Sequence, residues 1–214
     1  NADLANDLGN LLARVRALLI RHLDGTFGAA SEPAGDGDRE VVKAGLELPG
    51  KVRIYVGELK LHAALEEVLQ YVRQLNRYFN DEEPWKLAKD LENHDRLGDV
   101  LRCAAEGLLT ASVLLEPALP TKAAQIRRDL GLADFRLDAI ESWGRIPAGT
   151  TIPLETDLLF PKIEIREESP GADRPAKKQV KEENEVESQA EIAIEDFNQV
   201  QLKVAQVIEA ERVP

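Results

Sequence analysis

The sequence has few of the residues that build disulfide frameworks, metal sites or membrane spans. It contains one cysteine, Cys103, three histidines and no methionine among 214 residues. A single cysteine excludes an intrachain disulfide and fits a reducing compartment. The histidines, His22, His62 and His94, are scattered, and none has a cysteine or histidine at ligand spacing, which argues against a zinc site. No apolar run approaches the ~20 residues that cross a bilayer and no signal peptide is visible, so we expect a cytoplasmic protein without a membrane partner.

The charge balance is acidic, with 39 Asp and Glu residues against 27 Lys and Arg and a formal net charge of −12. An overall negative field opposes binding to bulk nucleic acid or to an anionic membrane. It leaves room for a small local basic site, so the distribution of charge matters more than the sum.

Motifs of catalysis are also missing. No Gly-rich phosphate loop, Walker-type lysine or G-x-S-x-G turn is present. The carboxylates lie on predicted solvent faces, and Cys103 lies beside Ala104 and Ala105 on a predicted helix, where a small core residue is the better interpretation than a nucleophile. We therefore expect no catalytic residue, metal or cofactor in this chain.

Both ends of the sequence suggest a piece of a longer protein. The chain begins at Asn1, without methionine, and it ends in "EAERVP", just after a strongly patterned apolar run. We expect further residues in the parent protein on both sides.

Apolar residues that recur at three- and four-residue steps predict three long helices. The first covers Asp3–Gly25, with Asp3 as its cap, the second covers residues 56–79, and the third runs from about Asp95 to Leu115. Residues 28–50 are rich in Gly, Pro, Ala and Asp and predict a loop or a short helical excursion. The residues expected to face the core are Leu4, Leu8, Leu11, Leu12, Val15, Leu18, Leu19 and Leu23 in the first helix, Leu61, Leu65, Val68, Leu69, Val72, Leu75 and Phe79 in the second, and Leu97, Val100, Leu101, Ala104, Leu108, Ala111 and Leu115 in the third.

Shorter elements complete the pattern. Pro84 opens a short helix that ends near Asp90, because proline suits the first helical position. Thr121 is expected to cap a helix that ends at Gly131. A short element at 133–144 follows, and then an extended closing segment with prolines at 153 and 161. Helices joined by short loops predict an all-α, antiparallel helical bundle.

Residues 164–193 differ in composition from the rest of the chain. They are charged and lack aromatics, so they cannot bury enough apolar surface to offset their ordering entropy, and a flexible linker is expected. In the last segment, 194–214, Val200, Leu202 and Val204 alternate as in a strand. That segment is expected to be the opening of another domain whose remainder is missing.

A polar stripe runs along the first predicted helix. Asn10 and Arg14 are four residues apart, hence neighbours on one face, and Arg21 follows two turns later. An Asn beside an Arg supplies donors and an acceptor suited to base edges and phosphate.

Trp85 directly follows Pro84, so it stands on the first turn of a helix beside a loop, with Lys86 and Lys89 nearby. These residues could hold a splayed nucleotide. The simpler interpretation, a capping core aromatic and a solvated polar stripe, is favoured by the pattern alone, which leaves the function open.

Four segments together resemble a known family. "NDLGNLLARVRALLIRHLDG", "RYFNDEEPWKLAKD" and the closing "LLFPKIE" resemble the anticodon-binding domain of methionyl-tRNA synthetases, and "IEDFNQVQLKVAQVIEAERVP" resembles the start of the tRNA-binding OB-fold that many of these enzymes carry at the C-terminus. The resemblance implies a class I synthetase-type anticodon-binding domain at 1–163, a linker at 164–193 and a truncated OB-fold piece at 194–214.

The resemblance also implies roles for individual residues. Trp85 would stack on the cytosine of a CAU anticodon, and Asn10 and Arg14 would contact anticodon nucleotides. Pro84 would hold the turn, and Asn6, one turn before Asn10, would support the same surface. The implied partner is methionine tRNA.

The parent would be an ATP- and Mg²⁺-dependent methionine–tRNA ligase, with a homodimer possible through its missing C-terminal domain. The catalytic signatures H-I-G-H and K-M-S-K-S are absent from this chain. The alternative is a helical scaffold that binds protein partners and retains a degenerate anticodon-binding fold.

The composition of residues 164–193 leads to a first prediction. Limited proteolysis of the chain should cut there first and leave a stable bundle that ends near Lys162, because a charged, aromatic-free segment stays accessible to proteases. Mass spectrometry of the first products checks this. Strong amide-exchange protection across residues 177–191 would contradict the linker.

Overall fold

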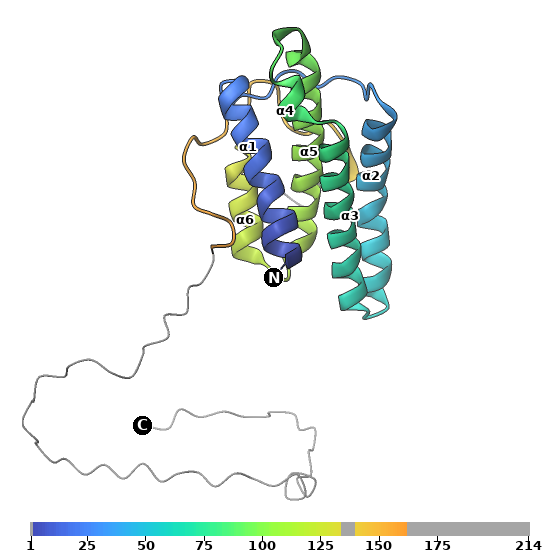
Figure 1. Cartoon of the computed structure of the whole chain (residues 1–214). Coiled ribbons are helices and arrows are strands. Elements are labelled where there is room, and N and C mark those ends of the chain that lie inside the picture. The colour runs from blue at the N-terminus through green and yellow to red at the C-terminus, as the bar shows by residue number, and fades with distance from the viewer. Residues whose placement is uncertain (1, 134–139, 162–214) are drawn as a thin grey trace, which may run out of the picture. The chain divides into compact units, whose positions relative to one another are not determined.

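The fold is a bundle of α-helices, seen in a computed structural model that describes residues 2–133 and 140–161 (Figure 1). A π-helical stretch, Ala2–Gly9, leads directly into the first helix. The α-helices are α1 (Asn10–His22), α2 (Asp36–Gly57), α3 (Leu61–Asp81), α4 (Pro84–Leu87), α5 (His94–Leu115) and α6 (Pro120–Asp129), with a 3₁₀ turn at Leu91–Asn93. The described residues form no strand and one isolated bridge, between Thr26 and Thr151. The predicted all-α antiparallel bundle is confirmed.

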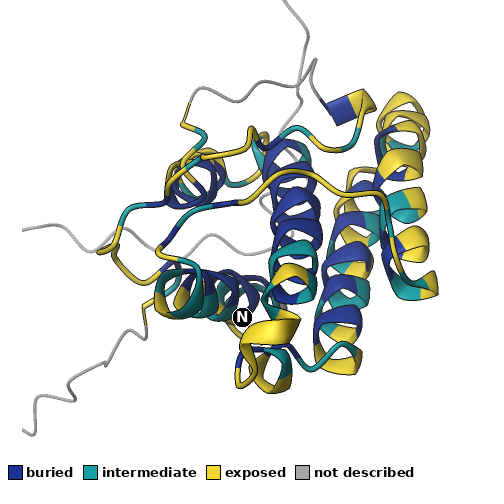
Figure 2. Cartoon of the chain, turned by 90° about the horizontal axis from the view of Figure 1, so that it is seen from above, coloured by how far each residue is buried: buried dark blue, intermediate teal, exposed yellow. Residues whose placement is uncertain are grey.

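Helix α5 lies at the centre of the bundle. It packs against α1, α2, α3, α4 and α6, and every residue from Val100 to Val113 is buried. A helix that is apolar on all sides is stable only when it is surrounded. Figure 2 shows the buried sides of the outer helices turned inward, with exposed residues on the outside. All seven core residues predicted for this helix are buried, so that prediction is confirmed.

The buried polar groups of α5 bind the closing segment. Glu106 is inaccessible to solvent; its carboxylate accepts a hydrogen bond from the Ile146 N–H at 2.6 Å and pairs with Arg145 at 2.9 Å. Arg102 donates to the carbonyl of Ile146 at 2.5 Å and to that of Gly28. Because a buried carbonyl or carboxylate without a partner is costly, these contacts determine where the segment runs.

A second arginine holds the closing segment on the α1 side. Arg16 is buried on α1 and donates to the carbonyl of Pro153 at 2.6 Å and to that of Asp129 at the end of α6. The described part of the segment is irregular and not continuously extended, because it turns at 148–149 and bends at 154 and 159–160. Backbone bonds also hold it: the Phe27 N–H donates to the carbonyl of Thr150 and the Ile152 N–H to that of Gly25, both at 2.9 Å. Arginine side chains bind carbonyls that these backbone bonds leave open.

The prediction for residues 28–50 is wrong, because a 22-residue helix, α2, begins at Asp36. Pro49 lies inside this helix and lacks the N–H that would bond the carbonyl of Gly45. A Cβ at Gly45 would lie 2.5 Å from the Tyr71 hydroxyl and 2.6 Å from the Trp143 ring. Glycine therefore permits close packing against α3, and this tertiary contact outweighs poor helix propensity.

Several boundaries also differ from prediction. The helix predicted at 56–79 is interrupted near its start. Helix α2 ends at Gly57, Leu59 adopts a positive φ of 59°, and α3 begins at Leu61. Leu61 and Leu65 are exposed, not inward. Thr121 is not the cap of α6, since Pro120 occupies the first helical position.

Two further predictions concern the first helix and the tail. The first helical run begins at Ala2, so Asp3 is inside it and not its cap. None of the helices in the described residues combines the length and apolar character that a membrane span requires. The predicted linker (164–193) and OB-fold piece (194–214) lie outside the described residues, and so does half of the short element at 133–144, namely 134–139.

The Glu106 contacts generate the second prediction. Glu106→Ala removes the acceptor of the Ile146 N–H and the buried ion pair with Arg145, so we expect the free energy of unfolding to fall by about 3–5 kcal/mol. Denaturant unfolding measures it. Glu141→Ala is the control, because it removes an exposed carboxylate 3.4 Å from Arg53 and should cost under about 0.5 kcal/mol. Equal losses for the two variants would contradict this account of the core.

Candidate functional site

Arg14 and Trp85, which the sequence separates by 71 positions, are in contact. The guanidinium carbon of Arg14 lies 5.2 Å from the centre of the Trp85 ring and 4.8 Å from that of Phe79. Its Nη2 donates a 2.9 Å hydrogen bond to Oδ1 of Asn80. The distances from the guanidinium carbon to the two ring centres are within the range of cation–π interactions. The three residues on α3 and α4 thus hold Arg14 in one place against the tryptophan.

Trp85 is neither a core residue nor a freely exposed one. It keeps 38% of its surface exposed, whereas Phe79 is inaccessible and Pro84 is buried. Pro84 opens α4, as predicted, and the Ala88 N–H bonds its carbonyl at 2.9 Å. The tryptophan is therefore anchored by its backbone on a buried proline, while part of its ring faces solvent.

The residue before Pro84 has an unusual backbone. Glu83 is in the left-handed region, with φ 44° and ψ 53°. A non-glycine residue rarely adopts this conformation, which costs about 1–3 kcal/mol and persists only where the surroundings hold it. Its carboxylate pairs with Lys86 at 2.7 Å. The chain turns sharply at Glu83 and directs α4 away from α3.

Asn10 and Asn6 are exposed on the same helical run as Arg14. Asn10, one turn before Arg14, also borders a groove of about 570 Å³ between α1 and the closing segment, lined in addition by Ala13, Leu154 and Phe160. Their amides are open to solvent and can donate and accept hydrogen bonds. The structure thus joins Arg14 to Trp85 directly, and it places Asn10 beside them on a neighbouring surface.

The charge at this site is a single partly buried cation. Partial burial lowers the pKa of Arg14, but a guanidinium remains protonated at neutral pH. Arg21 and Lys89, from the same predicted polar group, are exposed. Such a site suits stacking and a few directed hydrogen bonds better than neutralisation of many phosphates.

Metal-binding groups of side chains are absent from residues 2–133 and 140–161. His22 and His94, distant in the sequence, lie edge to face with ring centres 6.2 Å apart, but no group of three or more His, Cys, Asp and Glu side chains there could hold a metal ion. Cys103 is buried as predicted, and burial raises the pKa of its thiol to about 12. At neutral pH the thiol is protonated and unreactive.

Two residues of the site were not identified from the sequence. Phe79 was expected only as a core residue, and Asn80 was not singled out. An asparagine at the end of a helix is common, so no pattern distinguishes Asn80. Its contact with Arg14 is visible only in three dimensions.

The chain is similar over its whole length to curated methionine–tRNA ligases, although no family model matches it. It is 38% identical to the ligase of Deinococcus radiodurans, with 100% of this chain and 34% of the relative covered. The ligase of Bacillus subtilis is 34% identical, with 100% and 33% covered. The chain spans about a third of the length of these relatives.

Solved structures agree with these relatives. Apo methionyl-tRNA synthetase of Mycobacterium tuberculosis superposes with a TM-score of 0.70 at 30% identity, over 77% of this chain and 33% of that one. The same enzyme bound by methionyl-adenylate gives a TM-score of 0.69 at 30% identity, over 75% and 32%.

The contact between Arg14 and Trp85 generates the third prediction. In a Trp143→Phe background, Trp85 is the only tryptophan. Arg14→Ala should then make Trp85 fluorescence more accessible to acrylamide and reduce stability by only about 0.5–1 kcal/mol, the size of a partly exposed cation–π contact. Arg53→Ala, which removes an exposed arginine on α2, is the control and should leave quenching unchanged. Identical quenching in both variants would contradict the contact.

Proposed function

We propose that this chain, which is homologous over its whole length to a part of the methionyl-tRNA synthetases, is the segment of such an enzyme that recognises the CAU anticodon of methionine tRNA. The parent would be a cytoplasmic ligase that joins methionine to its tRNA with ATP. ATP and Mg²⁺ would act in the rest of the parent enzyme. This segment would select tRNA and carry out no chemical step.

The observation that carries the proposal is the half-exposed ring of Trp85. A ring that is anchored on one side and solvent-exposed on the other can stack on an unpaired base, and such stacking contributes about 1–3 kcal/mol per base. Arg14 supports the ring from within the protein. The contact keeps the tryptophan in one orientation, so less conformational freedom is lost when a base binds.

Arg14 and the two asparagines supply the polar contacts of the proposed interface. The Nη2 of Arg14 is engaged by Asn80 at 2.9 Å, which leaves other guanidinium N–H groups for base edges or phosphate oxygens. Asn10 and Asn6 add exposed amides on the same helical run. Together these groups resemble the way proteins recognise single-stranded loops, by stacking plus hydrogen bonds to unpaired bases.

The acidity of the chain is compatible with this role. Binding that depends on wide phosphate contact needs many cations and weakens steeply with salt. Recognition of a few bases presented by a loop needs only a small, well-placed set of donors and one stacking surface. The net charge of −12 would then suppress binding to other nucleic acids.

One observation favours the second candidate, a scaffold for protein partners. An apolar groove of about 540 Å³ lies between the α2–α3 corner and the end of α5, and Val56, Leu61 and Leu65 line it. Figure 1 shows this corner at the opposite end of the bundle from α4. The two candidates therefore involve different surfaces, and variants can separate them.

Titration with tRNA is the fourth prediction. Trp85→Ala should weaken binding to CAU-bearing methionine tRNA by about 5–150-fold, the loss of one stacking contact. Arg14→Ala should weaken it as well, and both variants should melt close to wild type, because neither side chain fills the core. Against a tRNA with a changed anticodon, the wild-type chain should bind weakly and the variants should lose little more.

Arg53→Ala is the matched control, because it removes an exposed arginine at the other end of the bundle. It should bind methionine tRNA as the wild type does. If Trp85→Ala lowers the melting temperature sharply while its folded fraction binds tRNA normally, the stacking role is wrong and the scaffold candidate gains.

A further inference from the structure

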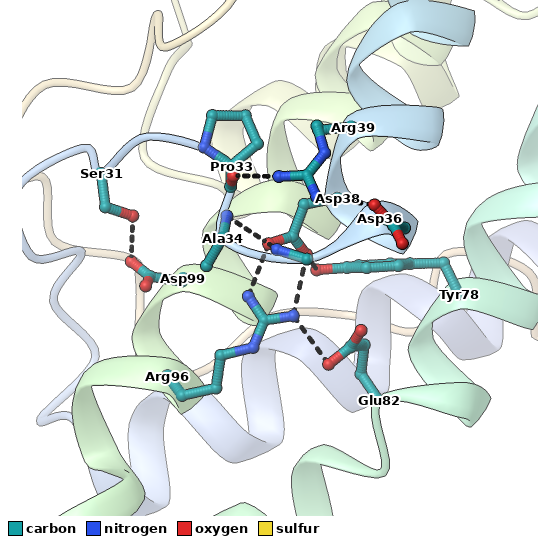
Figure 3. A network of polar contacts seen from close by, with 11 residues as sticks. Ser31, Pro33, Ala34, Asp36, Asp38, Arg39, Tyr78, Glu82, Arg96 and Asp99 are labelled. Carbon is teal, nitrogen blue, oxygen red and sulfur yellow. Dashed lines mark hydrogen bonds and ion pairs between the residues drawn. The ribbon is translucent and has the colours of Figure 1, made fainter.

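A network of ionised side chains joins three helices at the end of the bundle that carries α4 (Figure 3). Arg96 of α5 binds both carboxylate oxygens of Asp38 of α2, at 2.6 and 2.9 Å. The same guanidinium reaches Glu82, directly after α3, at 2.7 Å. The Tyr78 hydroxyl donates to Asp38 at 2.6 Å, and the Ala34 N–H donates at 3.0 Å. Arg96 is thus the only residue of this set that contacts both carboxylates.

The inner half of the network is strongly held. Asp38 and Tyr78 are only 4% and 5% exposed. Burial alone would raise the pKa of Asp38, but hydrogen bonds from Arg96, Tyr78 and the Gly35 N–H outweigh it and lower that pKa to about 2. Hydrogen bonding to Asp38 raises the pKa of Arg96. Both groups stay ionised at neutral pH, and the two-point contact fixes the plane of the guanidinium.

The outer half of the network reaches the corner that presents Trp85. Glu82 immediately precedes Glu83, whose φ of 44° is the outlier at this turn, and Pro84 and Trp85 follow. The Glu82 N–H still bonds the carbonyl of Tyr78 at 3.0 Å. The Glu83 N–H adds a longer bond, 3.3 Å, to the carbonyl of Asn80, so the backbone ties of the corner to α3 end at Glu83. A strained residue persists only where its neighbours are held on both sides.

Both sides of Glu83 are held in this structure. On the far side, buried Pro84 and the helical bonds of α4 hold the chain. On the near side, the Arg96–Glu82 ion pair ties the end of α3 to the first turn of α5. Without that pair, the α3 end of the corner would keep the backbone bonds of the Glu82 and Glu83 N–H groups but would lose its side-chain tie to α5.

We infer that Glu82, held by Arg96, is a positioning residue that fixes the orientation of Trp85 for base stacking. The part of this inference that concerns RNA binding rests on the proposed function. Glu82 would not touch the RNA itself. It would act by keeping the turn at Glu83 in the one conformation that aims the tryptophan ring, and a misplacement of a stacking group by about 1 Å can cost up to about 100-fold.

The direction in which RNA affinity changes when Glu82 is removed separates a positioning role from simple charge repulsion. A carboxylate near a nucleic-acid interface repels phosphates, so removing it would tighten binding. If Glu82 positions Trp85, removing it loosens the corner and weakens binding. The two interpretations predict opposite changes for the same substitution.

Glu82→Ala is the variant of choice. Arg96→Ala would leave the buried carboxylate of Asp38 without its cation, which is strongly destabilising, whereas Glu82→Ala removes only the contact to the corner. Asp36→Ala is the matched control, because Asp36 forms an exposed 2.6 Å pair with Arg39 on α2 and has no contact with the corner. All variants are made in the 214-residue chain with Trp143→Phe, so that Trp85 is the only tryptophan and is excited selectively over the tyrosines.

Two measurements test the inference. Without RNA, Glu82→Ala should lower the fluorescence anisotropy of Trp85 and raise its quenching by acrylamide, while Asp36→Ala should change neither. With an RNA hairpin carrying the CAU anticodon, Glu82→Ala should weaken binding by about 3- to 20-fold, less than the loss of Trp85 itself. In a Trp85→Ala background the further loss should vanish, because residues that act through one group are not additive.

The outcomes are separable. Unchanged or tighter binding of the hairpin by Glu82→Ala, or an equal loss with and without Trp85, overturns the positioning role. If the wild-type chain does not distinguish CAU from a changed anticodon, the proposed function fails. The anisotropy of Trp85 then decides the positioning role alone, and an unchanged value in Glu82→Ala overturns it.

Discussion

Burial of the central part of α5, from Val100 to Val113, is the constraint on which the rest of the structure depends. Because this helix has neighbours on every side, each polar group along its buried length needs a partner inside the protein. Glu106 and Arg102 find theirs in the closing segment. That segment has backbone bonds to residues 25–27 over a short stretch, and side chains from the bundle bind its backbone on either side of it. The need to pair the buried polar groups of α5 therefore also determines the path of the chain after α6.

The need of buried polar groups for partners also shapes the first turn of α5, at the end of the bundle that carries α4. Arg96 is partly buried, and it is stabilised by Asp38 on one side and Glu82 on the other. A charge in this position stabilises the fold only if its partners are well oriented, and a fixed orientation is what Trp85 would need in the proposed stacking on a base. Packing of the core and presentation of Trp85 are thereby coupled. The corner at Glu83 is a strained backbone held by contacts that begin in the bundle's interior.

The candidate site combines residues of two kinds. Trp85 and Arg14 were singled out from the sequence, by the Pro-Trp helix start, the polar stripe and the family resemblance. Phe79 and Asn80, which hold Arg14 in place, were not, and neither was the pair Glu82–Arg96. Residues that touch a ligand follow a motif, whereas residues that orient them need only be near in space. Local sequence therefore identifies the first kind and not the second.

The sequence by itself determined the all-α class, the central helix with its seven core residues and the short helix at Pro84, because periodicity and proline act over a few neighbouring residues. Only the tertiary structure decided that residues 36–57 form a helix despite Gly45 and Pro49. Close packing of Tyr71 and Trp143 against Gly45 favours a helix that local propensity opposes. The same holds for Arg14 and Trp85, since a contact between residues 71 positions apart depends on how the helices pack and on no local pattern.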